Sequence, residues 1–203
     1  MKKRYFKCDF GYLVRQTKKE IIKTIIYFAI PIAIFIFGII TTMMRTPDDI
    51  SWLTARYNIL TLAAVLGLLP ASRQLISMLM FIKNKKHHLD DDKYGRICEV
   101  NVNELRIRYD LFMTSYDKTY PVLSMIMADD VLLGYTEKKD FAYEDFYKHI
   151  KSMLAKNGLK AGSVKVFDDF EKYLGRIRVY NENNIVQTDK DREVMRLMEN
   201  LSL

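Results

Sequence analysis

Three polar side chains near the ends of predicted strands form the set whose types and spacing best suit catalysis. Asp110 lies on a strand predicted from alternating apolar residues at 105–113, and Glu137 and Lys139 follow a later strand pair. Residues two apart on a strand share a face, so Glu137 and Lys139 could converge. Acidic and basic groups brought together in this way are used in metal-assisted hydrolysis. These three positions are the catalytic candidates of the chain.

The order of these elements resembles the core of the PD-(D/E)xK nuclease superfamily over about 45 residues. In that family an aspartate and a glutamate hold a divalent metal, and the lysine two residues after the glutamate positions the attacking water. The resemblance implies these roles for Asp110, Glu137 and Lys139. The sequence departs from the family pattern because Tyr109 stands where a proline usually precedes the aspartate. Two alternatives stay open: an inactive relative of that fold, or solvated charges at the end of a hairpin.

No other motif indicates a cofactor or a metal. The sequence contains no Walker loop, Gly-rich dinucleotide turn, HExxH, GxSxG or kinase motif. His87 and His88 are adjacent, so on a helix they would point about 100° apart, and we interpret them as a solvated juxtamembrane face. His149 lies on a separate predicted helix. Cys8 and Cys98 are expected to be reduced thiols, with Cys98 a small core residue on a strand.

The apolar residues are concentrated between residues 21 and 82. Of the 203 residues, 49% are hydrophobic and 28% are charged, and the counts of 8 Gly, 4 Pro and 2 Cys exclude collagen-like and disulfide-rich classes. Residues 24–44 contain no charged side chain, and residues 57–77 contain only Arg73. About 20 apolar residues span the hydrocarbon core of a bilayer. The sequence therefore predicts a transmembrane helical hairpin over residues 21–82.

Local signals predict where these helices begin. Thr17 and Glu20 have the spacing of a capping box, which predicts the start of the first helix. Pro47 follows Thr46 and precedes two aspartates, a pattern typical of a helix N-terminus, and it predicts the start of the second. The connecting external loop is expected over residues 45–56.

The distribution of basic residues predicts the topology. Residues 1–23 carry eight basic and two acidic side chains, whereas the loop at 45–56 carries two of each. By the positive-inside rule, both termini are expected in the cytoplasm of a cell-membrane protein. Residues 95–203 carry 17 basic and 18 acidic residues, so nucleic acid is an unlikely partner and anionic lipid the expected one. The lysines expected at lipid headgroups are Lys18, Lys19, Lys23, Lys83, Lys85 and Lys86.

The second span carries two further candidate features. Arg73 is expected to reach the cytosolic headgroups from within about one helical turn, and the alternative is a place along an anion or substrate path. Ala63, Gly67 and Ala71 recur at every fourth residue, which allows another helix to approach closely. This stripe is interpreted either as packing within the hairpin or as a face for self-association.

The remaining periodicity predicts the domain organisation. We expect a basic N-terminal segment at 1–20, the hairpin at 21–82, a charged linker at 83–94 and a cytosolic α+β domain at 95–203 with the order ββββ-α-β-α-α. Its expected function is binding or assembly at the membrane, alone, as a homo-oligomer or in a larger membrane complex. The alternatives are a membrane-tethered metal-dependent nuclease and an accessory subunit of a transporter. The Ile-, Lys- and Tyr-rich composition resembles that of small membrane proteins of low-GC Gram-positive bacteria.

Overall fold

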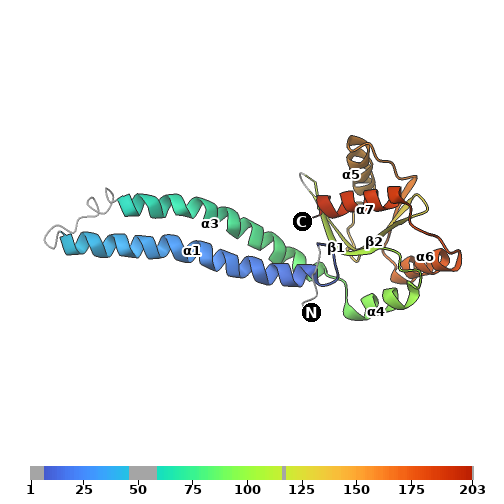
Figure 1. The fold of residues 1–203 in the computed structure, drawn as a ribbon, viewed down its shortest axis with the longest axis horizontal. Coiled ribbons are helices and arrows are strands. Elements are labelled where there is room, and N and C mark those ends of the chain that lie inside the picture. The colour runs from blue at the N-terminus through green and yellow to red at the C-terminus, as the bar shows by residue number, and fades with distance from the viewer. Residues whose placement is uncertain (1–6, 46–58, 116–117, 203) are drawn as a thin grey trace. The chain divides into compact units, whose positions relative to one another are not determined.

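The computed structural model describes residues 7–45, 59–115 and 118–202 (Figure 1). These residues form two compact units. One unit contains the described part of Met1–Val14 together with Lys86–Leu203, and the other is Arg15–Lys85. We call the first the α+β unit and the second the hairpin unit. The N-terminal segment thus belongs to the α+β unit, although the sequence places it before the hairpin.

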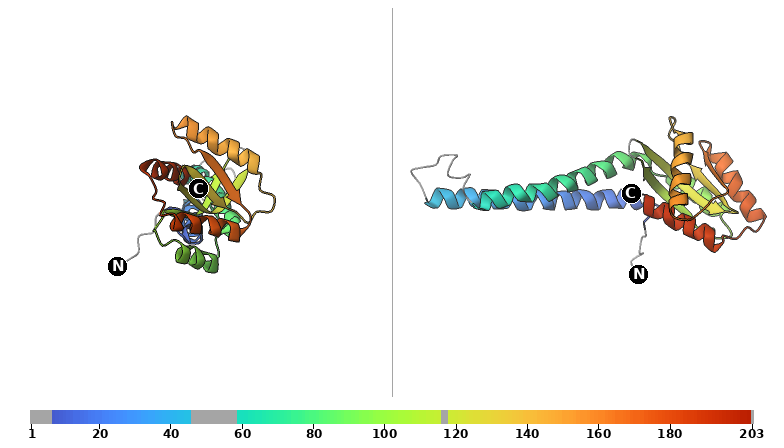
Figure 2. Two further views of the ribbon diagram at one scale, coloured as in Figure 1. Left: turned by 90° about the vertical axis from the view of Figure 1, so that its right-hand side faces the viewer. Right: turned by 90° about the horizontal axis from the view of Figure 1, so that it is seen from above.

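The hairpin unit consists of two long helices, α1 (Tyr12–Arg45) and α3 (Ile59–Asn84), which lie side by side in both Figure 1 and Figure 2. Both are long and apolar enough to span a membrane. The helices approach closely where a side chain is missing: a Cβ added at Gly67 would lie 3.0 Å from Cγ of Pro31, and one added at Gly38 would lie 3.2 Å from Cβ of Leu60. The two glycines therefore fix the spacing of the helix pair.

The helix starts predicted from local signals have different outcomes. Helix α1 begins at Tyr12, so the prediction of a cap at Thr17 was wrong. Thr17 and Glu20 are instead buried inside the helix pair, where the Thr17 hydroxyl donates to the carbonyl oxygen of Phe81 at 3.4 Å. The predicted start at Thr46–Asp49 and the loop beyond Arg45 lie outside the described residues.

The α+β unit is built on one four-stranded mixed sheet with helices, which confirms the predicted fold class. The strand order is β1-β2-β3-β4, with the first two pairings antiparallel and the pairing of β3 with β4 parallel. The strands are β1 (Ile107–Thr114), β2 (Thr119–Ala128), β3 (Val131–Tyr135) and β4 (Ser163–Phe167). The helices are α4 (Asp91–Val100), α5 (Tyr143–Lys156), α6 (Phe170–Glu182) and α7 (Asp189–Leu201), and a short 3-10 helix, η1, covers Lys85–His87.

Helix α4 replaces the first strand of the predicted order. Cys98, Val100 and Val102 alternate with polar residues in the sequence, but Cys98 and Val100 lie in this helix, and Cys98 is exposed. The prediction of Cys98 as a core residue on a strand was therefore wrong. The side chain of Asp90 caps the helix, and Ile97 is its fully buried residue. The buried apolar side chain and the N-cap stabilise the helix more than the short period-two pattern favours a strand.

The sheet has a hydrophobic cluster on each face, and the helices lie on both sides of it (Figure 2). One cluster contains buried residues of α5 and α7, and the other contains buried residues of α4 and α6. Strand β1 contributes to both, because Ile107 and Tyr109 belong to the α4/α6 cluster while Leu111 and Met113 belong to the α5/α7 cluster. The change of face occurs at Asp110, whose φ of 54° is in the left-handed region. The predicted strand is real, but it is buried on two faces rather than one.

The N-terminal segment is part of this packing. Cys8 is fully buried, and its carbonyl oxygen accepts a hydrogen bond from the Tyr109 amide at 2.9 Å. Asp9 pairs with Arg108 at 3.0 Å, and the Phe10 ring stacks on Tyr94 with centroids 3.9 Å apart. Residues 8–10 are thus held to β1 and α4 by a backbone bond, an ion pair and a ring contact.

Candidate functional site

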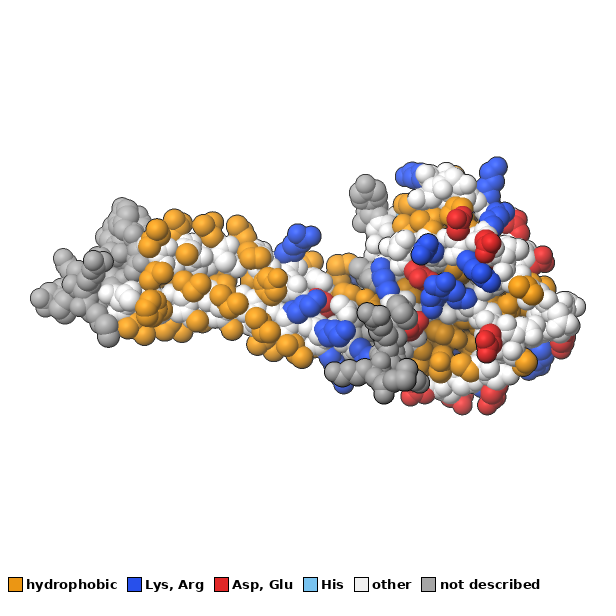
Figure 3. All heavy atoms as spheres, viewed as in Figure 1, with side chains coloured by type: hydrophobic (Ala, Val, Ile, Leu, Met, Phe, Trp, Pro, Cys, Tyr) orange, Lys and Arg blue, Asp and Glu red, His pale blue; other side chains and the backbone are white. Residues whose placement is uncertain are grey.

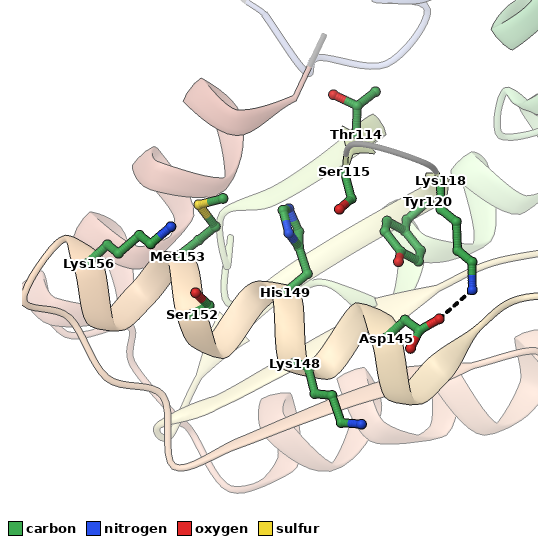
Figure 4. Close-up of a pocket in the computed structure, with 10 residues that line it drawn as sticks. All are labelled: Thr114, Ser115, Lys118, Tyr120, Asp145, Lys148, His149, Ser152, Met153 and Lys156. Carbon is green, nitrogen blue, oxygen red and sulfur yellow. Dashed lines mark hydrogen bonds and ion pairs between the residues drawn. The ribbon is translucent and has the colours of Figure 1, made fainter.

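A basic pocket lies between helix α5 and the facing ends of β1 and β2 (Figure 4). Its volume is about 740 Å³, which is within the range of small-molecule sites. The residues that line it are Thr114, Ser115, Lys118, Tyr120, Asp145, Lys148, His149, Ser152, Met153 and Lys156.

Helical spacing explains the α5 wall of the pocket. Asp145, His149, Ser152 and Lys156 are three or four residues apart, so they share one face of the helix. Another face of the same helix carries Phe146, Ile150 and Leu154, which are buried in the α5/α7 cluster. Packing of that apolar face on the sheet therefore sets the position of the polar face.

The opposite wall comes from the β1–β2 end. Thr114 pairs with Thr119 in the strand register, and the Ser115 amide donates to the Lys118 carbonyl oxygen at 2.8 Å. Tyr120 is buried and its ring stacks on His149, with centroids 6.1 Å apart and planes at 24°. The strand end thus supplies polar groups above an aromatic wall.

The described lining residues are unequal in charge, with three lysines against one carboxylate. Lys118 forms an ion pair with Asp145, and this contact holds the pKa of that carboxyl below its usual value. Burial lowers the pKa of His149, and the Lys156 ammonium lowers it further. His149 is therefore neutral at pH 7, and the positive charge of the pocket comes from the lysines.

The side chains of the three lysines point in different directions (Figure 4). His149 and Ser115 point toward one another across the pocket, and Lys156 extends beside Met153, whereas Lys148 extends from α5 away from His149. In the same view Lys118 is bound to Asp145 on the other side of His149 from Lys156, so an anion in the pocket would meet Lys156 without breaking that ion pair.

Sequence reasoning missed this site. The sequence predicts only that His149 lies on a helix, and none of the lining residues is among the predicted site residues. The available signal was the polar face at Asp145, His149, Ser152 and Lys156. It predicts an exposed helix face equally well, because the facing Ser115 and Lys118 are distant in sequence.

The predicted catalytic residues are not brought together. Asp110 is on β1 and Glu137 follows β3, and β2 separates these strands, which places them about 10 Å apart in the sheet. Glu137 accepts hydrogen bonds from Lys93 at 2.5 Å and Tyr135 at 3.0 Å, and Lys139 is exposed. Within the described residues, no group of three His, Cys, Asp or Glu side chains is placed to hold a metal ion.

Asp110 is nevertheless a deeply buried carboxyl group of the α+β unit. Its side chain is 1% exposed, and its Oδ1 accepts a hydrogen bond from the Leu89 amide at 3.0 Å, while its Oδ2 has no hydrogen-bond partner among the residues that the structure describes. Burial raises its pKa to about 6, although the nearby Leu89 and Gly11 amides and His88 act in the opposite direction. Nδ1 of His88 is also buried, with no hydrogen-bond partner in the described part of the chain.

The predicted residues of the second span divide between two environments. Gly67 faces Pro31 and Ala71 is fully buried, whereas Ala63 is exposed and its neighbour Ala64 is buried instead. Arg73 is exposed. The lysines predicted at headgroups, Lys18, Lys19, Lys23, Lys83, Lys85 and Lys86, are all exposed as well.

A buried carboxylate that was not predicted as a site residue lies between the two helices. Glu20 accepts hydrogen bonds from Gln16 and Lys23, both at 2.9 Å, and from Gln74 of α3 at 2.5 Å. It was treated only as a helix cap, because the partner on the second helix is 54 residues away in sequence.

Comparison of this chain with protein-family models, with curated proteins and with solved structures finds no match.

Proposed function

We propose that this protein is a membrane-anchored binding module, in which the hairpin unit spans the cell membrane and the α+β unit binds its ligand or partner on the cytosolic side. The observation that carries the proposal is the distribution of side chains around the helix pair. Large apolar side chains cover its outer surface (Figure 3), among them Ile25 at 63% and Leu69 at 67% exposed. Contiguous apolar surface of this extent requires an apolar solvent or a partner.

Burial argues against a soluble helix pair. Only 17% of the most apolar window of α1 and 11% of that of α3 is buried, whereas the core helix of a soluble protein is mostly buried. The inward side carries small and polar groups instead, including Thr24, Ala64 and Gly67. Close contact through small residues is how helices associate in lipid, where burial of apolar side chains gives no driving force between them.

The charge distribution supports the orientation. Lys18, Lys19 and Lys23 near the start of α1 and Lys83 at the end of α3 are exposed and lie at the same end of the helix pair. Cytoplasmic ends of membrane helices are enriched in such residues. Anionic lipid headgroups are the expected contacts of these lysines.

The pocket supports binding rather than catalysis as the role of the α+β unit. Its neutral histidine faces hydroxyls and lysines, and no nucleophile–base pair lies within hydrogen-bond distance among its described lining residues. The nuclease alternative is less favoured, because Asp110 and Glu137 have separate sets of contacts.

Thiol labelling tests the proposal with the native sequence. Cys98 is exposed and Cys8 is buried, so a membrane-impermeant maleimide should react at Cys98 in inside-out vesicles and not in right-side-out vesicles. A C98S variant is the control for specificity. S51C in a C98S background should label in the opposite vesicle type, because Ser51 is in the predicted external loop.

Two results would overturn the proposal. The first is extraction of the protein from membranes by alkaline carbonate, which releases peripheral proteins only. The second is labelling of Cys98 from the outer side.

A further inference from the structure

The described lining residues of the pocket in the α+β unit carry more positive than negative charge. Among the lining residues that the structure describes, Asp145 is the single acidic one, and Lys118 already pairs with it. Lys156 forms no ion pair within the described part of the chain, and its charge acts on the ring of His149. An anion entering the pocket would therefore gain an ammonium group without displacing an internal carboxylate.

The type of basic residue distinguishes among anions. Bidentate recognition of a carboxylate is typical of arginine, whose guanidinium matches the two oxygens, and no arginine is among the lining residues that the structure describes. Lysine acts as a point charge and is a common ligand for phosphate. The hydroxyls of Ser115 and Ser152 and the His149 ring add hydrogen-bond donors around it. A tetrahedral anion with several acceptor oxygens fits this set better than a planar one.

The walls indicate what the anion would be attached to. The stacked rings of Tyr120 and His149 and the thioether of Met153 form an apolar side next to the lysines. A volume of about 740 Å³ is enough for a small organic molecule and too small for a folded partner.

We propose that this pocket binds a phosphate ester, with Lys156 at the phosphate and the Tyr120–His149 wall against the organic part. The inference rests on the proposed role of the α+β unit as a binding module and names its ligand class. The phosphate can belong to a soluble ester or to a phospholipid headgroup, because both present the same oxygens.

Calorimetric titration of the full chain in phosphatidylcholine nanodiscs, with pyrophosphate as the probe, tests the charge requirement. Replacing Lys156 by Gln should weaken binding about tenfold or more, which is the loss expected when a charged hydrogen bond is removed. The matched control is K151Q: Lys151 is also an exposed lysine of α5, but it does not line the pocket. Its affinity for the probe should equal that of the unmodified protein.

A second arm separates the two sources of phosphate. Acylation of Lys156 is followed by mass spectrometry in nanodiscs with and without phosphatidic acid, with Lys190 on α7 as the internal reference. Slower acylation with pyrophosphate supports a soluble ester, and slower acylation with phosphatidic acid alone supports a headgroup.

The inference is overturned if neither probe protects Lys156, or if K151Q and K156Q weaken binding equally. Cys98 labelling is measured in the same preparations. A correct labelling pattern combined with failed binding would reject the phosphate site and leave the membrane-anchored module intact.

Discussion

The buried carboxylate of Asp110 offers the most direct test of the packing of the α+β unit. We consider its replacement by asparagine, which has the same shape. Asparagine tolerates the left-handed φ of 54° at this position and keeps an oxygen that accepts the hydrogen bond of the Leu89 amide. The substitution therefore changes the charge and leaves most of the geometry in place.

The magnitude follows from the pKa. Burial raises the pKa of Asp110 from 3.8 to about 6, a difference of about two units, which corresponds to about 3 kcal/mol. Because the pKa in the folded state is above that in the unfolded state, the stabilising contribution is complete below about pH 4 and is lost as the pH rises through 6. Asp110→Asn should therefore raise the free energy of unfolding at pH 7 by up to about 3 kcal/mol, and it should change little at pH 4.

The assay is urea unfolding of the full chain in detergent, followed by near-ultraviolet circular dichroism of the buried tyrosines, such as Tyr173, between pH 4 and 7. Asp110→Ala is the control: it loses the hydrogen bond of Leu89 and places alanine at a positive φ, so it should be destabilising by roughly 1–3 kcal/mol. The reasoning fails if Asp110→Asn is less stable than the unmodified protein at pH 7. It also fails if the two proteins lose stability in parallel between pH 4 and 7.

Two further predictions concern helix spacing and thiol burial. Gly67→Leu should separate the helix pair, because a Cβ at this position already lies 3.0 Å from Pro31. Ala63→Leu, at an exposed site, is the control and should leave the pair in place. Thermal unfolding followed by far-ultraviolet circular dichroism should show a loss of stability of about 1–3 kcal/mol in the Gly67 variant alone. An equal loss in both would contradict this packing. Cys98 should be alkylated in the folded protein, whereas Cys8 should react only on unfolding, because it is fully buried and burial raises the pKa of its thiol to about 11. Mass spectrometry after a timed pulse of alkylating reagent measures the extent of labelling at each cysteine. Equal labelling of the two without denaturant would contradict the burial of Cys8.

Features that depend on neighbouring residues were predicted from the sequence. The two apolar helices follow from uncharged runs of about 20 residues, which no short-range signal opposes. In α5, Phe146, Ile150 and Leu154 repeat with the helical period, and Asp169 stands directly before α6 and caps it. In each case the local pattern and the tertiary packing favour the same conformation.

Features that depend on a distant partner were not predicted. Cys98, Val100 and Val102 fit a strand by alternation, and burial of Ile97 in the α4/α6 cluster favours the helix instead. The alternating residues of β1 change face at Asp110, which no count of apolar positions reveals. These choices are made by the surfaces available in the folded chain, and a single segment carries no information about them.

The same limit applies to the candidate site. The sequence by itself determined that two apolar helices with basic flanks precede a charged α+β unit, because hydropathy and charge are properties of each segment. Only the tertiary structure decided that Lys118 and Lys156, 38 positions apart, line one pocket. Their place in one pocket requires α5 to pack its apolar face on the sheet beside the β1–β2 end, and that packing arises from long-range contacts among buried side chains.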